Sequence, residues 1–208
     1  MEALNIEQLP KKDTPAKCEP LTKDLDGDPP DGDCNCASVI GMLQCLQSHS
    51  RPDITHAVSQ CARFAHSPRR SHEIALEHIG QHLKGTIEEG LIMKPTDNFN
   101  IDVYVDADFA GLWPHEDKND PTCVKSRTGH AICIADCPVI WGSKLQGSIA
   151  LSTTEAEYNA LSMTMRLVLP LLELYKTVGS SLGIASEVAT HFQTTVWEDN
   201  NECLILAN

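Results

Sequence analysis

Three acidic residues stand at positions where a folded chain could use them for chemistry. Asp106 ends a stretch of alternating apolar and polar residues, Glu157 falls in the first turns of a long amphipathic pattern, and Asp199 follows another apolar stretch. Carboxylate oxygens suit Mg²⁺ or Mn²⁺, and two such ions about 3.5–4 Å apart can activate a water and stabilise the leaving oxygen in phosphodiester hydrolysis. We therefore predict Asp106, Glu157 and Asp199 as catalytic residues and metal ligands, with Mg²⁺ as the cofactor and Mn²⁺ as a possible substitute.

The positions of these acids also allow a plainer interpretation. Residues 97–208 contain fifteen acidic residues, so some must fall at strand ends and helix starts without any function. Glu157 would then be only a capping residue. The three acids are 51 and 42 residues apart along the chain, so only folding can bring them together.

The strands that must position these acids are indicated by a change of period at residue 97, from helical to alternating. Alternation predicts a first strand up to Asp106, a second over 130–135 and a third over 139–143, joined as an antiparallel meander. A fourth strand is predicted over roughly 191–197. In such a sheet the fourth strand lies beside the first, which brings Asp106 and Asp199 to neighbouring strand ends.

A long helix is predicted between the third and fourth strands. Ser152 and Glu155 have capping-box spacing, and Pro170 should kink or restart the helix. A last helix begins just before the sequence stops at Asn208. The order β-β-β-α-β-α predicts an α/β fold with a mixed sheet and helices packed against it.

The residues before position 97 divide into two parts. Residues 38–96 predict a small helical segment with three amphipathic helices, the first with Val39, Met42, Leu43 and Leu46 as its buried face. Residues 1–37 contain five prolines and nine acidic residues against four basic ones, which predicts a disordered acidic lead-in. A calcium loop within 24–33 is the alternative, but two prolines interrupt it and no glutamate closes it.

Composition excludes several classes of protein. The net charge of −13 is the opposite of what a free-standing nucleic-acid binder usually carries. No apolar run approaches the roughly 20 residues that span a bilayer, and no secretory signal begins the sequence. Nine irregularly spaced cysteines argue against a disulfide framework. We expect an intracellular protein that is neither secreted nor bound to a membrane.

Two other metal sites can be considered from residue types alone. A zinc site could use residues spread over 115–137, but a Cys-x2-Cys pair is absent and His130 and Cys133 should point to opposite faces of their strand; the candidates are His115, Cys123, His130, Cys133 and Cys137. His78 and His82 are spaced i, i+4, but without an HExxH frame they are predicted to be exposed on a helix face.

Short segments around the three acids closely resemble the ribonuclease H domain of copia-type retrotransposon Pol polyproteins. They occur in the family's order: YVDADFAG at 104–111, KSRTG at 125–129, WGSK at 141–144, LSTTEAEYNAL at 151–161 and EDN at 198–200. Upstream segments resemble the end of the reverse transcriptase: RPDI at 51–54, ARF at 62–64 and LKGT at 83–86. The resemblance runs from about residue 38 to the C-terminus, with 97–208 as the ribonuclease H-like domain.

This resemblance implies cleavage of the RNA strand of an RNA–DNA hybrid as one step of retrotransposon reverse transcription. Matched to the family's motifs, the metal-binding acids are Asp106, Glu157 and Asp199. Asp108 is a candidate neighbour of the site or, equally well, a turn or surface residue, and Glu155 is expected to be only a helix-start charge. The implied partners are the hybrid and the remainder of the Pol polyprotein, in cytoplasmic particles or the nucleus.

The sequence also departs from the family. It ends before the family's last strand and helix, which carry a fourth metal-binding acid, and Ala107 stands where a polymerase would need a second aspartate. We therefore expect no polymerase activity and weak or absent nuclease activity from this chain alone. The alternative function is a catalytically dead retroelement remnant that serves at most as a structural or interaction module.

Overall fold

The computed structural model describes residues 4, 6–31, 35–97, 99–182 and 193–207 and divides into two compact units. The first unit comprises Met1–Leu91 and Leu112–Cys123, and the second comprises Ile92–Gly111 and Val124–Asn208. The candidate acids all belong to the second unit.

The first unit is helical, as the sequence predicts for this region. It contains α1 (Cys36–His49), the short 3-10 helix η2 (Pro52–Ile54), α2 (Thr55–Ala62) and α3 (Arg70–Gly85), and a second 3-10 helix, η3 (Pro121–Val124), lies at its boundary. Proline at the start of η2 suits a first helical position, where no backbone N–H is needed. The helices share one core, made of Cys36, Val39, Ile40, Leu43, Ile54, Ala57, Val58, Cys61, Leu76 and Ile79.

The buried face of α1 differs from the predicted one. Val39 and Leu43 are buried as predicted, but Met42 is 53% exposed and Leu46 36% exposed. Ile40 completes the face instead, because it is i+1 to Val39 and i−3 to Leu43 and so lies on the adjoining side of the same stripe. The prediction was therefore wrong for Met42 and Leu46.

The acidic lead-in, for which the sequence predicts disorder, follows a defined path over α2 and α3 in its described part. The backbone N–H of Leu21 donates to Gln60 Oε1 over 2.7 Å, and the carbonyl of Thr22 accepts from His72 Nε2 over 2.7 Å. Helix side chains thus satisfy backbone groups of this proline-rich segment. The predicted calcium-loop alternative at 24–33 extends into residues 32 and 33, which lie outside the described part.

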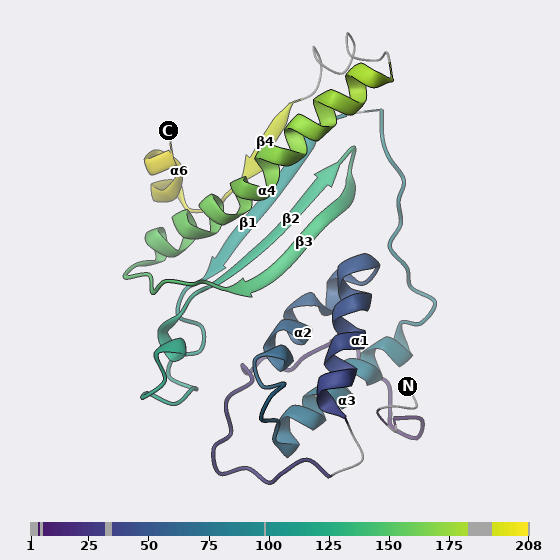
Figure 1. Cartoon of the computed structure of the whole chain (residues 1–208), viewed down its shortest axis with the longest axis vertical. Coiled ribbons are helices and arrows are strands. Elements are labelled where there is room, and N and C mark those ends of the chain that lie inside the picture. Colours follow the sequence, from purple (N-terminus) through teal and green to yellow (C-terminus); the bar gives the residue numbers. More distant parts are fainter. Residues whose placement is uncertain (1–3, 5, 32–34, 98, 183–192, 208) are drawn as a thin grey trace. The chain divides into compact units, whose positions relative to one another are not determined.

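The second unit is a mixed four-stranded sheet covered by a long helix (Figure 1). β1 (Ile101–Asp108), β2 (Arg127–Ile134) and β3 (Cys137–Leu145) form the predicted antiparallel meander. β4 (Thr194–Trp197) pairs in parallel with β1, so the strand order is β3-β2-β1-β4. The α/β class, the element order and the place of the fourth strand beside the first are confirmed. Residues 191 and 192 of the predicted fourth strand lie outside the described part.

The helix α4 (Thr153–Ser181) packs across β1 and β2, and its core contact is Val168 against Ile101, Val103 and Ile132. Its start is capped as predicted: the N–H of Glu155 donates to Ser152 Oγ over 3.1 Å, and Glu155 accepts from the N–H of Leu151. It continues as one helix through Pro170 rather than restarting there. A short last helix, α6 (Asn201–Ala207), packs against α4.

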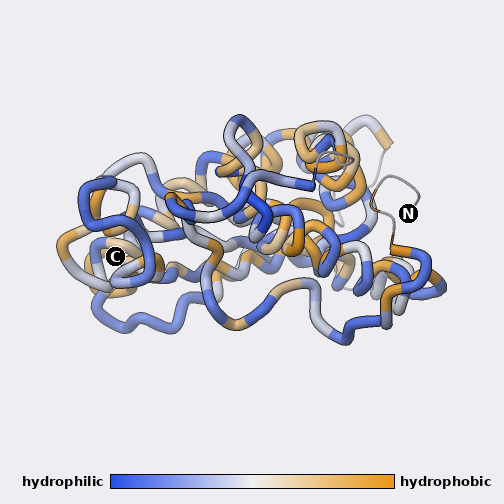
Figure 2. Tube along the Cα trace, turned by 90° about the horizontal axis from the view of Figure 1, so that it is seen from below, coloured by the Kyte–Doolittle hydropathy of each residue, from blue (hydrophilic) through white to orange (hydrophobic). Residues whose placement is uncertain are grey.

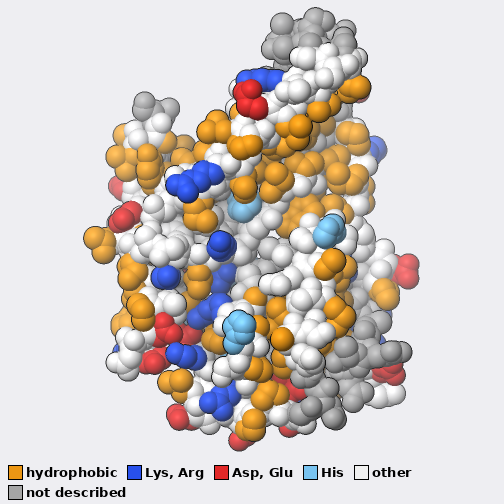
Figure 3. Space-filling view, in the orientation of Figure 1, with side chains coloured by type: hydrophobic (Ala, Val, Ile, Leu, Met, Phe, Trp, Pro, Cys, Tyr) orange, Lys and Arg blue, Asp and Glu red, His pale blue; other side chains and the backbone are white. Residues whose placement is uncertain are grey.

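Several apolar side chains are exposed along α4 (Figure 3). They are Leu167, Leu169, Leu174 and Val178. Among the helices in the described ranges, none is both long and apolar enough to cross a membrane. Along the whole Cα trace, hydrophobic and hydrophilic residues alternate in short runs (Figure 2).

Candidate metal centre

The parallel pairing of β1 with β4 brings two of the predicted acids together. The last pair in this ladder is Tyr104 with Trp197. Asp106 and Asp199 each follow their member of that pair by two residues, so extending the register sets them opposite one another. Both residues are exposed, which leaves their carboxylates open to solvent.

Glu157 joins them from the second turn of α4. Asp106, Glu157 and Asp199 each offer one carboxylate oxygen, and these oxygens all lie within 4.8 Å of one another. Glu157 is only 7% exposed, and its Oε2 atom has no hydrogen-bond partner among the described residues. The structure thus brings together the three predicted site residues, although they are far apart in the sequence.

The electrostatics of this cluster favour a bound cation. Burial, followed by the negative charges of Glu198, Asp106 and Asp199, raises the pKa of Glu157 to about 7, against a smaller opposing effect from the backbone N–H of Ala107. Carboxylates this close repel one another unless a proton or a metal ion lies between them. A hard divalent cation matches the all-oxygen donor set and would bind the Glu157 oxygen that has no hydrogen-bond partner among the described residues. The residues present therefore fit such an ion.

Glu198 is a neighbouring carboxylate that acts electrostatically on Glu157 without belonging to the three-acid cluster, and sequence reasoning did not single it out. Its Oε1 accepts from the N–H of Asn200 over 3.0 Å, while its Oε2 is buried without a partner among the described residues. Burial and the charges of Asp199 and Asp106 raise its pKa. The sequence feature that could have identified Glu198 was its position directly before Asp199.

The surrounding hydrogen bonds fix the elements that carry the acids. The buried Gln146 donates through Nε2 to the carbonyl of Ala156, over 2.8 Å, and to Thr128 Oγ1, over 3.2 Å, which ties α4 beside Glu157 to β2. Asn200 Oδ1 accepts from the N–H of Cys203 over 2.9 Å, so α6 begins directly after Asp199. Thr154 Oγ1 donates to Glu202 Oε2 over 2.7 Å, which links α4 to α6.

The other acids named from the sequence have different places. Glu155 serves the helix start, as expected, through its bond to Leu151. Asp108 is exposed and its carboxyl group lies against Gly111, where any side chain would collide with it. It is not a member of the three-acid cluster.

The zinc alternative is not formed among the described residues. Across the described ranges, the three acids are the one group of three or more histidine, cysteine or acidic residues close enough to share an ion, and the predicted zinc candidates form no such group. The prediction that both histidines are exposed was wrong: His78 is half-buried, with its Nε2 bonded to the carbonyl of Thr14 over 3.0 Å, and His82 is 6% exposed and bonds to Asp53 Oδ2 over 2.9 Å. Hydrogen bonds to protein groups compensate an imidazole for its lost contact with solvent.

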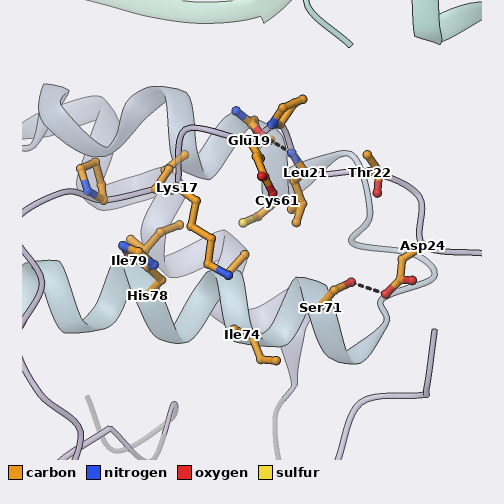
Figure 4. A pocket seen from close by; sticks show the side chains of 16 residues that line it. Lys17, Glu19, Leu21, Thr22, Asp24, Cys61, Ser71, Ile74, His78 and Ile79 are labelled. Atoms are coloured by element: carbon orange, nitrogen blue, oxygen red, sulfur yellow. Dashed lines mark hydrogen bonds between the residues drawn. The ribbon is translucent and has the colours of Figure 1, made fainter. Parts of the chain in front are cut away.

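The first unit contains a separate pocket of about 340 Å³ (Figure 4). The N-terminal segment forms one side of it, with Lys17 and Asp24, and α3 forms another, with His78 and Ser71. Ser71 Oγ donates to Asp24 Oδ2 at one end. None of the predicted site residues lines this pocket.

The chain is similar to several known proteins over about three fifths of its length. It is 36% identical over 126 residues to a retrovirus-related Pol polyprotein from transposon RE1 of Arabidopsis thaliana, covering 61% of this chain and 8% of that protein. It is 38% identical over 128 residues to the corresponding polyprotein from transposon TNT 1-94 of Nicotiana tabacum, covering 62% of this chain and 9% of that protein. The chain therefore spans less than a tenth of the length of these polyproteins.

The chain also matches a much shorter protein over most of that protein's length. The chain is 34% identical over 125 residues to the secreted RxLR effector protein 161 of Plasmopara viticola, covering 60% of this chain and 82% of that protein. No family model matches the chain, and no solved structure matches it.

Proposed function

The chain belongs to the family of retrovirus-related Pol polyproteins of copia-type transposons, and from this premise we propose that its second unit is a ribonuclease H-like domain that hydrolyses the RNA strand of an RNA–DNA hybrid. The observation that carries the proposal is the convergence of Asp106, Glu157 and Asp199, with carboxylate oxygens within 4.8 Å of one another. Acids at the ends of two parallel neighbouring strands and on a covering helix are what the family resemblance implies.

The three residues have complementary roles in this proposal. Asp106 and Asp199 are exposed and hold their oxygens where a phosphodiester can approach. Glu157 is buried, and the backbone N–H of Ala107 bonds to its carboxylate, which fixes the third oxygen against the strand end. These three carboxylates would hold a divalent cation, which when bound would supply Lewis-acid activation of a water and stabilisation of the leaving oxygen.

The negative charge of this unit requires that a cation bind before the nucleic acid does. Residues 97–208 carry fifteen acidic and six basic residues, and three of these acids gather in the cluster where the phosphate would bind. Without a cation this cluster repels a nucleic-acid backbone. In this proposal the rest of the polyprotein supplies the basic contacts to the hybrid. Residues 38–96 are the end of a reverse transcriptase. The RNA 2′-OH distinguishes the cleaved strand from DNA.

A cleavage assay on the whole chain tests the proposal. The chain, its Asp106→Asn variant and its Asp97→Asn variant are incubated with an end-labelled RNA–DNA hybrid and Mg²⁺ or Mn²⁺. Loss of a metal ligand removes several kcal/mol of transition-state stabilisation, so Asp106→Asn should slow cleavage about a hundredfold or more, while the exposed Asp97, outside the cluster, should be dispensable. Equal rates for the chain and Asp106→Asn, or no cleavage by any of the three proteins, would contradict the proposal.

A further inference from the structure

Hydrogen bonds fix the N-terminal segment that forms one wall of the pocket in the first unit. The bonds lie on both sides of Lys17. The carbonyl of Thr14 accepts from His78 Nε2 over 3.0 Å, and the carbonyl of Leu21 accepts from Arg63 Nη1 over 3.0 Å. The wall between them is therefore held against α2 and α3, and the pocket of about 340 Å³ has room for a small organic molecule.

The floor of this pocket is aliphatic. The residues that α2 and α3 contribute to it are Ala57, Cys61, Ile74, Ala75 and Ile79. Ile74 is 42% exposed, so a ligand that covers it removes apolar surface from water. Among the described residues that line the pocket, none is a phenylalanine, tyrosine or tryptophan on which a planar ring could stack. The floor therefore suits a flexible aliphatic chain.

Opposite charges lie on the two sides of this floor. Figure 4 shows Lys17 on the side of His78, and Asp24 on the other side, where Ser71 Oγ donates to its Oδ2. Ser71 and His78 are seven residues apart on α3, which separates the two sides by about 10 Å along the helix. Among the described residues, neither Lys17 nor Asp24 forms an ion pair, so both charges can act on a ligand.

The balance of charge disfavours ligands that carry a charge of one sign alone. Glu19 lines the pocket as well, which gives two acids against one lysine. A simple anion would meet this excess of negative charge, and a simple cation would leave Lys17 without a partner. His78 does not restore the balance, because burial lowers the pKa of its imidazole and leaves it uncharged near neutral pH.

We propose that this pocket binds a linear aliphatic zwitterion, with its carboxylate on Lys17, its ammonium on Asp24 and its methylene chain over the aliphatic floor. Both protein groups are available without breaking an ion pair, and the bonds that fix the wall reduce the ordering cost of binding. The pocket belongs to the first unit, so this inference does not depend on the metal centre or on nuclease activity.

Calorimetric titration of the whole chain with three small molecules tests the proposal. They are ε-aminocaproate, caproate, which lacks the ammonium, and hexylamine, which lacks the carboxylate. Because each charge-assisted hydrogen bond contributes about a factor of ten, ε-aminocaproate should bind about tenfold more tightly than either of the others. Lys17→Gln should reduce its affinity to about that of hexylamine. Asp24→Asn, whose amide oxygen can still accept from Ser71, should reduce it to about that of caproate.

Two further variants locate the binding. Lys11→Gln, at an exposed lysine of the same segment outside the pocket lining, should bind like the chain. Ala75→Leu fills the floor and should remove binding, with circular dichroism of every variant to check its fold. Equal affinity for the three molecules, or no binding at about 10 mM, would overturn the proposal. So would a Lys17→Gln variant that matches Lys11→Gln, or a folded Ala75→Leu variant that matches the chain.

Discussion

The rings of Tyr104 and Trp197 stack across the parallel pair of β1 and β4, with centroids 6.2 Å apart and an angle of 11° between their planes. Trp197 Nε1 also donates to Asp102 Oδ1 over 2.9 Å. β4 has only four residues, so this stack and this bond are a large part of what holds it in register. Asp199 depends on that register for its place beside Asp106.

Replacing Trp197 by alanine should therefore loosen β4 and move Asp199. A cross-strand aromatic pair contributes about 1 kcal/mol, so we expect a loss of that order in the free energy of unfolding together with weaker Mn²⁺ binding. Trp197→Phe keeps the ring stack and should retain most of both. Chemical denaturation and Mn²⁺ titration of the two variants check this, and equal Mn²⁺ affinity in Trp197→Ala and the chain would refute the link between β4 and the site.

The raised pKa of Glu157 predicts how stability varies with pH when no metal is present. Its folded-state pKa of about 7 lies above its ordinary value of 4.5, so the folded state holds the proton more tightly than the unfolded state. The free energy of unfolding should therefore fall as pH rises from 4.5 to 7. Glu157→Gln removes this contribution, and Mg²⁺ should offset the loss in the chain itself.

Thermal unfolding in a chelator at pH 5 and pH 7.5 measures this effect. The drop in Tm between the two values should be smaller in Glu157→Gln than in the chain. Glu173→Gln, an exposed acid on the same helix, should behave like the chain. An identical drop in all three proteins would show that Glu157 is ionised in the folded state at both pH values.

Asp53 in the first unit gives the opposite pH dependence. Burial opposes its ionisation, but hydrogen bonds from Arg51 and His82, of 2.7 and 2.9 Å, outweigh burial and lower its pKa to about 2. Because this value is below the ordinary 3.8, the stabilisation is fully present above pH 4 and is lost as pH falls through 2. Asp53→Asn should therefore be less stable than the chain at pH 6, and the difference should shrink by pH 2. Urea denaturation at both values checks it; a constant difference would contradict it.

Two ion pairs of the first unit should differ widely in how much they contribute to the free energy of unfolding. Arg63 Nη2 and Glu116 Oε2 are 2.7 Å apart, and only 2% of the Glu116 side chain is exposed. Lys23 and Asp120 are 3.3 Å apart, with 48% of the lysine side chain exposed. Glu116→Ala leaves a nearly buried guanidinium unpaired and should cost about 3–5 kcal/mol, whereas Lys23→Ala should cost about 0–1 kcal/mol. Urea denaturation of both variants decides it, and similar losses would mean that burial does not govern these pairs.

The second unit was more predictable than the first, for a physical reason. Alternation along β1 fixes its faces, and the place of a fourth strand beside the first follows from the element order, so the meeting of Asp106 and Asp199 could be foreseen. In the first unit, neither the path of the N-terminal segment nor the burial of His82 has a periodic signal, since both depend on single bonds such as that of Leu21 to Gln60. Glu198 was missed because the burial of its Oε2 depends on how the chain packs after β4, for which the sequence holds no periodic signal.

The parallel pairing of β1 with β4 also sets the order in which the site can assemble. Asp199 is synthesised 93 residues after Asp106, and the ladder between their strands closes a loop that contains β2, β3 and α4. Such non-local pairings form late, since loop closure costs entropy before any contact is gained. The meander and α4 can therefore fold before Asp199 joins Asp106 and Glu157, and the three-acid cluster is complete only once β4 has docked on β1.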